Sequence, residues 1–205
     1  MTPTTPPILR DLPDELTGER VLIRPLRPGD GAAIFDAVEE SRAEIGPWLP
    51  WVAKTLAASD SEEAVRRSMA RWALREDLMV GIWDRATGRY LGGSGLHRMD
   101  WAVPSFEIGY WLRTSAWGQG YVTEAVQVLC RFAFETLGAN RVEILCDAKN
   151  VRSAAVPKRL GFTQEALLRN ECRDGAGNLR DTLIFALTPS DYAQAKALWQ
   201  NGGSL

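Results

Sequence analysis

The sequence has few of the residues that build metal centres or disulfide frameworks. It contains three cysteines and one histidine in 205 residues. The cysteines, Cys130, Cys146 and Cys172, show no CxxC spacing. An odd number of cysteines without paired spacing argues against a disulfide framework and against a Cys/His zinc site. We therefore expect no bound metal, and reduced thiols of the kind found in cytoplasmic proteins.

Long apolar runs and an excess of one charge are missing as well. No run of 18 apolar residues occurs, which predicts no membrane-spanning helix. The net charge is −2 and Lys and Arg never form long runs, so binding of nucleic acid through a basic surface is not expected. The start, rich in Pro and Thr, lacks the basic and apolar regions of a signal peptide. We expect a flexible tail over 1–18 and one domain over 19–205.

The pattern of apolar residues and turn residues predicts a mixed α/β (α+β) domain. Alternating stretches and Gly- or Pro-containing turns indicate strands, and three- to four-residue spacing indicates helices. The second helix would begin at an N-cap, Asp60 or Ser61. Expected strands cover 19–26, 78–84, 89–100, 105–113, 140–147, 162–174 and 179–187. Expected helices cover 30–41, 59–74, 119–138, 150–161 and 190–200.

The segment SAWGQGYVTEA, residues 115–125, places two glycines between an expected strand and a long helix. It does not fit the dinucleotide fingerprint GxGxxG, because the third glycine position is Thr123. A Walker loop is absent, and the GxSxG motif of serine hydrolases fails at Leu96. Glycines before a helix can expose backbone N–H groups to a pyrophosphate. A tight corner without a ligand is the alternative that this segment alone leaves open.

Four segments carry a resemblance to a known family. They are FEIGYWLRTSAWGQGYVTEA (106–125), NVRSAAVPKRLGF (150–162), RVLIRPLRPGD (20–30) and IGPWLPW (45–51). The chain resembles the GNAT acetyltransferase superfamily, in particular its ribosomal-protein N-terminal acetyltransferase (RimJ/RimL-like) branch. The resemblance spans nearly the whole chain after residue 18. It implies the GNAT fold, a mixed and mostly antiparallel sheet of about seven strands flanked by helices.

The resemblance also implies where acetyl-CoA, the co-substrate, would bind. The strand over 106–112 would diverge from the strand over 142–145, and the pantetheine arm would lie between them. One N–H group of this strand would face the thioester oxygen. The pattern [Q/R]xxGxG begins here with Ser115, so one side-chain contact of the family is in doubt. The implied cofactor-binding residues are Tyr110, Trp111, Leu112, Trp117, Gly118, Gln119, Gly120, Tyr121, Val122, Asn150 and Ser153.

Transfer of acetyl to an amine needs a base for the amine and an acid for the departing thiolate. We expect Glu107 to be the base, because its apolar neighbours would raise its pKa. Glu165 is the reserve, and His97 is a second reserve. Many relatives have a tyrosine seven residues after the Asn as the acid. Here that residue is Pro157, which leaves Ser153 as the acid or as a residue of plain helix packing.

The segment IGPWLPW would form part of the acceptor site. Trp48 is expected to line that site and Trp51 to fill the core, while Glu44 would offer a carboxylate to the amine or a plain surface charge. The leading acceptor is the N-terminal α-amino group of a protein, and the branch that the chain resembles implies a ribosomal protein. A small amine (a polyamine, an aminoglycoside or an amino acid analogue) is the second hypothesis, and a non-catalytic acetyl-CoA-binding module is the third. Homodimers are common in the family.

Overall fold

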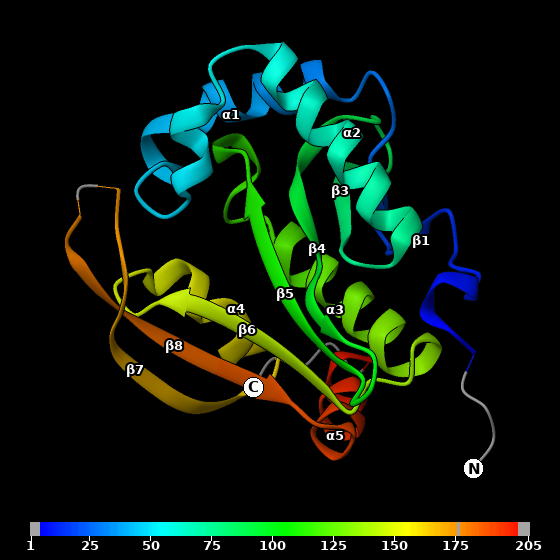
Figure 1. Ribbon diagram of the computed structural model, residues 1–205. Helices are drawn as coiled ribbons and strands as arrows, with labels where there is room; N and C mark the ends of the chain where they lie inside the picture. Colours follow the sequence, from blue (N-terminus) through cyan, green and yellow to red (C-terminus); the bar gives the residue numbers. More distant parts are fainter. Residues whose placement is uncertain (1–4, 176, 201–205) are drawn as a thin grey trace.

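The computed structural model describes residues 5–175 and 177–200, which form one eight-stranded sheet flanked by helices (Figure 1). The strand order is β1-β2-β3-β4-β5-β6-β8-β7. The strands are β1 Leu16–Thr17, β2 Val21–Pro25, β3 Leu78–Asp84, β4 Tyr90–Asp100, β5 Ser105–Leu112, β6 Arg141–Asp147, β7 Thr163–Arg173 and β8 Leu179–Leu187. The helices are α1 Gly31–Ile45, α2 Ala58–Leu74, α3 Tyr121–Arg131, α4 Val151–Arg159 and α5 Pro189–Gln200. The predicted element order is confirmed, with the short β1 as an addition.

The two faces of the sheet pack against different helices (Figure 1). Residues that alternate along β5 divide accordingly: Phe106 and Ile108 are fully buried in the main core, together with apolar residues of α3. Trp111, on the opposite face, packs in the clusters that contain Ala37 and Val38 of α1. Because side chains of a strand point alternately to both faces, this division follows directly from the predicted alternation.

The sheet consists of two parts that meet at β5 and β6. All neighbouring strands are antiparallel except this pair, which is parallel. β5 and β6 are paired only from Ser105–Arg141 to Glu107–Glu143. Beyond Glu107 the two strands continue without pairing, which leaves the divergence that the family resemblance implied.

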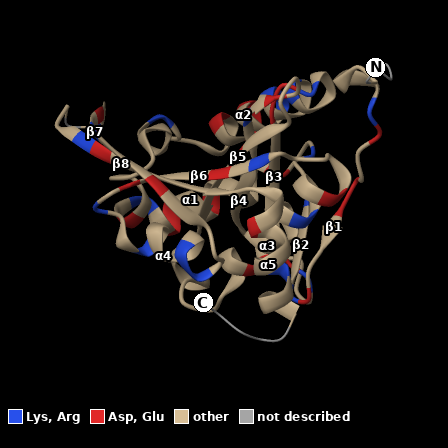
Figure 2. Ribbon diagram, turned by 90° about the horizontal axis from the view of Figure 1, so that it is seen from below, with Lys and Arg blue, Asp and Glu red and all other residues tan. Residues whose placement is uncertain are grey.

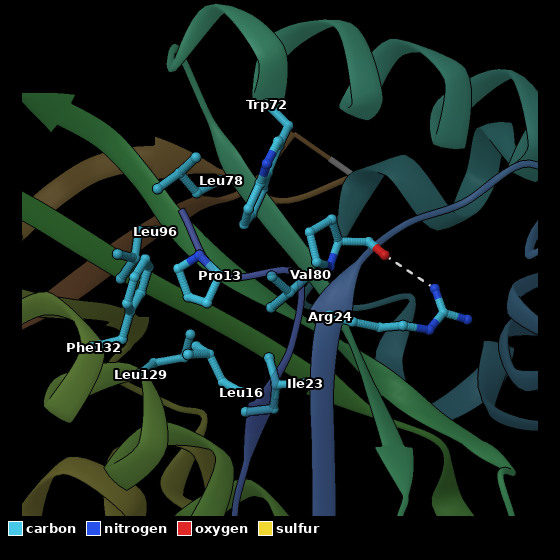
Figure 3. A pocket seen from close by; sticks show the side chains of 11 residues that line it. Pro13, Leu16, Ile23, Arg24, Trp72, Leu78, Val80, Leu96, Leu129 and Phe132 are labelled. Atoms are coloured by element: carbon cyan, nitrogen blue, oxygen red, sulfur yellow. Dashed lines mark hydrogen bonds between the residues drawn. The ribbon is translucent and has the colours of Figure 1, made fainter. Parts of the chain in front are cut away.

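The segment before β2 packs on the sheet. Pro13 and Leu16 point among side chains of β2, β3, β4 and α3 (Figure 3). The Arg10 guanidinium lies 5.0 Å from the Trp101 ring and donates to the Leu137 carbonyl oxygen at 3.3 Å. The assignment of 1–18 to a flexible tail stays a prediction, and these contacts describe residues 5–18 only.

Two local expectations were wrong. α2 begins after Ala57, and Asp60 instead lies in the first turn, where its carboxylate accepts the N–H groups of Leu56 and Ala57 at 2.8 and 2.9 Å. Trp51 is not a core residue, because it is 38% exposed and touches Trp111 edge-on at 5.5 Å between ring centroids. Its segment forms a short 3-10 helix, Pro50–Lys54, that lies on the outside of α1.

Acidic and basic residues are interspersed over the ribbon (Figure 2). Within residues 5–175 and 177–200, no helix is both long and apolar enough to cross a membrane. The same residues contain no cluster of three or more His, Cys, Asp or Glu side chains that could hold a metal ion. Cys130 and Cys146 are buried free thiols, and Cys172 is an exposed one.

Candidate active site

The glycine turn between β5 and α3 presents a row of backbone donors. Gly118 and Gly120 have φ values of +72° and +82°, which only glycine adopts without strain. A Cβ atom at Gly118 would meet no atom within 4 Å, so the turn faces open space. Among the described residues, no acceptor is recorded for the N–H groups of residues 118–123. Unpaired donors at a helix N-terminus are suited to an anion, and the pyrophosphate site expected from the sequence stays a prediction.

Three arginines surround this row of donors. Arg20 donates to the Gln119 carbonyl oxygen at 2.8 Å, and Arg159 donates to the Thr123 hydroxyl at 3.1 Å. The Arg152 guanidinium lies 4.8 Å from the Trp117 ring. Arg152 and Arg159 both belong to α4, which carries blue segments in Figure 2. The backbone donors and these guanidinium groups together favour a ligand with several negative charges.

Glu40 of α1 binds the residues just before the glycine turn, and the sequence did not predict this role. Its carboxylate accepts the Ser115 N–H at 2.9 Å and the Thr114 hydroxyl at 3.2 Å. It also forms ion pairs with Arg113 and Arg89. Arg113 foremost, and then Ser115, lower the pKa of Glu40 from 4.5 to about 2, against an opposing effect of burial. In sequence, Glu40 is indistinguishable from the other acids of an amphipathic helix, because its partners lie more than 45 residues away.

Replacing Glu40 with Gln should change the response of the fold to acid. A carboxyl group whose folded pKa is depressed contributes stability above its unfolded pKa and loses it as the pH falls through the folded value. For Glu40 this window extends from pH 4.5 down to about 2. The parent should therefore lose free energy of unfolding more steeply in this window than Glu40→Gln, as measured by urea unfolding at several pH values. Glu63→Gln, which removes an exposed α2 ion pair with Arg67, is the matched control. Parallel curves for parent and Glu40→Gln would contradict this role.

Tyr110, Asn150 and Ser153 meet where β5 and β6 diverge. The Asn150 side-chain oxygen accepts the Ser153 N–H at 3.1 Å and caps α4. The Tyr110 hydroxyl donates to the Ser153 carbonyl oxygen at 2.8 Å, and the Ser153 hydroxyl donates to the Tyr110 oxygen at 3.3 Å. Pro157 lies inside α4, which continues to Arg159, so the proline neither opens nor ends the helix. The sequence predicted Asn150 and Ser153 here, but not the hydroxyl of Tyr110.

Glu107 lies at the last paired position of β5 and β6, beside the opening. Its side chain is 14% exposed, and burial raises the pKa of the carboxyl above its usual value. Arg98 and His97 oppose this shift, and Glu143 adds to it. The Arg98 Nη1 atom lies 3.1 Å from Glu107 Oε2, but the oxygen has no hydrogen bond with correct geometry among the described residues. Glu107 therefore combines a raised pKa with a buried oxygen that has no hydrogen-bond partner among the described residues.

Of the two reserve bases, His97 lies beside Glu107 and Glu165 does not. His97 is the cross-strand partner of Glu107, and its Nδ1 atom lies 2.9 Å from Asp77 Oδ2. Glu165 forms a two-bond ion pair with Arg141 at 2.7 and 3.1 Å, which lowers its pKa. A carboxylate that is neutralised in this way is a weaker proton acceptor than Glu107.

The segment around Trp48, which the sequence predicted to line the acceptor site, contacts strand β8. Arg180 of β8 stacks on the Trp48 ring at 5.2 Å and donates to the Pro47 carbonyl oxygen at 3.1 Å. Its guanidinium also pairs with the Asp147 carboxylate, and both side chains are at most 10% exposed. Glu44 is exposed on α1, and its role in the acceptor site stays a prediction. The sequence missed Arg180 and Asp147, which occur in ordinary alternating strands.

Comparisons with known proteins agree with this geometry. The model of the acetyltransferase (GNAT) domain family matches residues 20–163. YdaF of Bacillus subtilis (strain 168), by its name a candidate ribosomal N-acetyltransferase, is 30% identical over 183 residues, 87% of this chain and 96% of its own. The ribosomal-protein-serine acetyltransferase of Escherichia coli (strain K12) is 33% identical over 79 residues, 38% of this chain and 44% of its own.

Solved structures show the same fold. RimL, a ribosomal L7/L12 α-N-protein acetyltransferase solved in complex with coenzyme A, has a TM-score of 0.78 at 20% identity, over 85% of this chain and 97% of its own. The self-immunity acetyltransferase MccE, solved with acetyl-CoA and AMP, has a TM-score of 0.78 at 22% identity, over 83% and 93%. With the domain match over most of its length, the chain belongs to the acetyltransferase (GNAT) family and is an acyltransferase.

Proposed function

We propose that this protein transfers the acetyl group of acetyl-CoA to the N-terminal α-amino group of a protein. The observation that carries the proposal is the combination of three features: the donor row at residues 118–123, the divergence of β5 from β6, and Glu107 at the last pair before that divergence. The donor row fits a pyrophosphate, and the divergence fits an arm that pairs with main-chain groups near Tyr110, Trp111 and Leu112. The three free cysteines agree with a cytoplasmic location.

In this proposal each residue has one chemical role. Glu107 takes the proton of the acceptor ammonium group, and the neutral amine attacks the thioester carbon. A backbone N–H of residues 110–112 stabilises the oxyanion. The carbon–sulfur bond then breaks, and the Ser153 hydroxyl gives a proton to the thiolate. The attacking nitrogen loses its extra proton to solvent as the amide forms, and solvent returns a proton to Ser153. Cys146, whose pKa is raised by burial, stays a neutral thiol beside Ser153.

A protein N-terminus is favoured over a small polyamine by the walls of the site. Trp48 and Trp51 supply flat apolar surface, and most nearby acids are already paired: Asp147 with Arg180, and Glu165 with Arg141. A polycation would need several unpaired acids. The names of YdaF and of the E. coli relative point to ribosomal proteins as acceptors. The name of MccE refers to self-immunity against microcin C7 and to no ribosomal protein, so a small-molecule amine stays the second candidate.

Release of CoA from acetyl-CoA against a panel of acceptors tests the proposal. The panel holds short peptides that begin with Ser, Ala or Met, together with spermidine and an aminoglycoside. Thiol titration needs a blank without acceptor, because Cys172 is exposed and would react with the reagent. Release with peptides alone is the expected result. Release with a small amine alone would replace the proposed acceptor, and acetyl-CoA binding without any release would leave a binding module. Light scattering of the same sample tests the homodimer that the family resemblance implies.

A further inference from the structure

Pro157 leaves one carbonyl oxygen of α4 without its helical donor. The residue lies inside the helix with its ring buried. In an α-helix, the N–H at position 157 would bond the carbonyl oxygen four residues earlier, which belongs to Ser153, but proline has no N–H. The Ser153 carbonyl oxygen is therefore available to a donor from outside the helix.

The donor that takes this place is the Tyr110 hydroxyl, from a strand 43 residues away in sequence. It lies 2.8 Å from the Ser153 carbonyl oxygen, and the Ser153 hydroxyl lies 3.3 Å from the Tyr110 oxygen. With Asn150 on the Ser153 N–H, the backbone and the hydroxyl of Ser153 are all held. The Tyr110 side chain thus crosses from β5 to α4 beyond the last β5–β6 pair, Glu107–Glu143.

The Tyr110 hydroxyl is suited to remain a donor. Burial raises its pKa well above that of an ordinary tyrosine, with a smaller lowering by Ser153. It is therefore protonated throughout the neutral range, and its bond to the carbonyl oxygen does not depend on pH there. Breaking this bond would leave a buried donor and a buried carbonyl oxygen without partners, which lowers the stability of the fold. The bond is therefore expected to hold the two groups in a definite geometry.

We propose that Pro157 is a positioning residue for acetyl transfer: by withholding an N–H, it gives the Ser153 carbonyl oxygen to Tyr110 and so fixes the Tyr110–Ser153 hydroxyl pair. This inference rests on the proposed function, in which Ser153 protonates the leaving thiolate. A residue at 157 with an N–H competes for the same oxygen, and the Tyr110 ring then loses its anchor on α4. The Ser153 hydroxyl would remain present but would lose its orientation.

Pro157→Ala and Pro157→Leu restore the N–H, and Leu keeps more of the buried volume. Both should reduce kcat about 10- to 100-fold, the effect of a misplaced group, with the dissociation constant of acetyl-CoA within about threefold of the parent. Their unfolding temperature should change little, because the hydrogen bond that α4 gains replaces the one that the buried Tyr110 hydroxyl loses. Pro189→Ala, at the first position of α5, is the control for proline replacement in general.

A double-mutant cycle with Tyr110→Phe separates positioning from plain helix packing. If Pro157 acts through the Tyr110 hydroxyl, Pro157→Ala in the Tyr110→Phe background costs no further kcat. Equal loss in both backgrounds, or an unchanged kcat in Pro157→Ala, would overturn the inference. If the parent transfers acetyl to no acceptor, the proposed function has failed instead. The cycle is then measured on the free energy of unfolding, where coupling between positions 110 and 157 supports the inference and additivity overturns it.

Discussion

Glu107→Gln should lower kcat for acetyl transfer by about 10²- to 10⁴-fold, the usual contribution of a general base. The dissociation constant of acetyl-CoA should stay unchanged, because Glu107 does not belong to the donor row at residues 118–123. In the parent, the acid limb of kcat/KM should lie above the pH range of an ordinary glutamate, since burial raises the pKa of Glu107. Steady-state kinetics from pH 5 to 9 measure both effects. A kcat within about twofold of the parent would exclude Glu107 as the base.

Two neighbouring charges provide matched controls for this assignment. Arg98 lowers the pKa of Glu107, so Arg98→Gln should move the acid limb to higher pH. Glu143 raises that pKa, so Glu143→Gln should move the limb to lower pH. Neither variant removes the carboxyl group of Glu107. Opposite shifts in the two variants would assign the acid limb of kcat/KM to Glu107. An acid limb that shifts in neither variant would belong to another group.

Gly118→Val should weaken acetyl-CoA binding by about 100-fold, which corresponds to roughly 2.7 kcal/mol. The φ value of +72° places a β-branched residue in a strained conformation, and the new side chain would occupy the open space that the backbone donors face. Isothermal titration calorimetry with acetyl-CoA measures the loss directly.

Gly138→Val is the matched control for strain. Gly138 has φ +73° and open space around its Cβ position, but it follows the opposite end of α3. Both variants should lose similar free energy of unfolding, and only Gly118→Val should lose affinity for acetyl-CoA. Equal affinities in the two variants would mean that the turn does not bind the co-substrate.

The sequence predicted those parts of the molecule that depend on local pattern. Alternation gave β5 and its two faces, and the glycines before Tyr121 marked the turn and the start of α3. The missed contacts all join distant positions: Glu40 to Ser115, Arg180 to Trp48, and Tyr110 to Ser153. Each of these residues looks ordinary in its own element, because only the tertiary fold brings its partner near. Trp51 was misassigned for the same reason, since a tryptophan near helices is usually buried.

Pro157 shows how a single residue can be visible in sequence and still not be interpretable there. A proline at position 157 has no N–H, and in a helix the acceptor of that N–H would be the Ser153 carbonyl oxygen. The donor that takes the place of this N–H could be identified only once the strand that faces α4 was known. The local rule identified an unsatisfied oxygen, and only the structure identified Tyr110 as its donor.

The short parallel contact between β5 and β6 has a mechanical consequence. Three residue pairs join the strands on either side of it, while antiparallel ladders hold each part together internally. A ligand that lies along both unpaired edges would connect the two parts of the sheet where only three residue pairs join them. Occupancy should then stabilise this junction, so that the two parts of the sheet unfold together more strictly in the loaded protein than in the free protein.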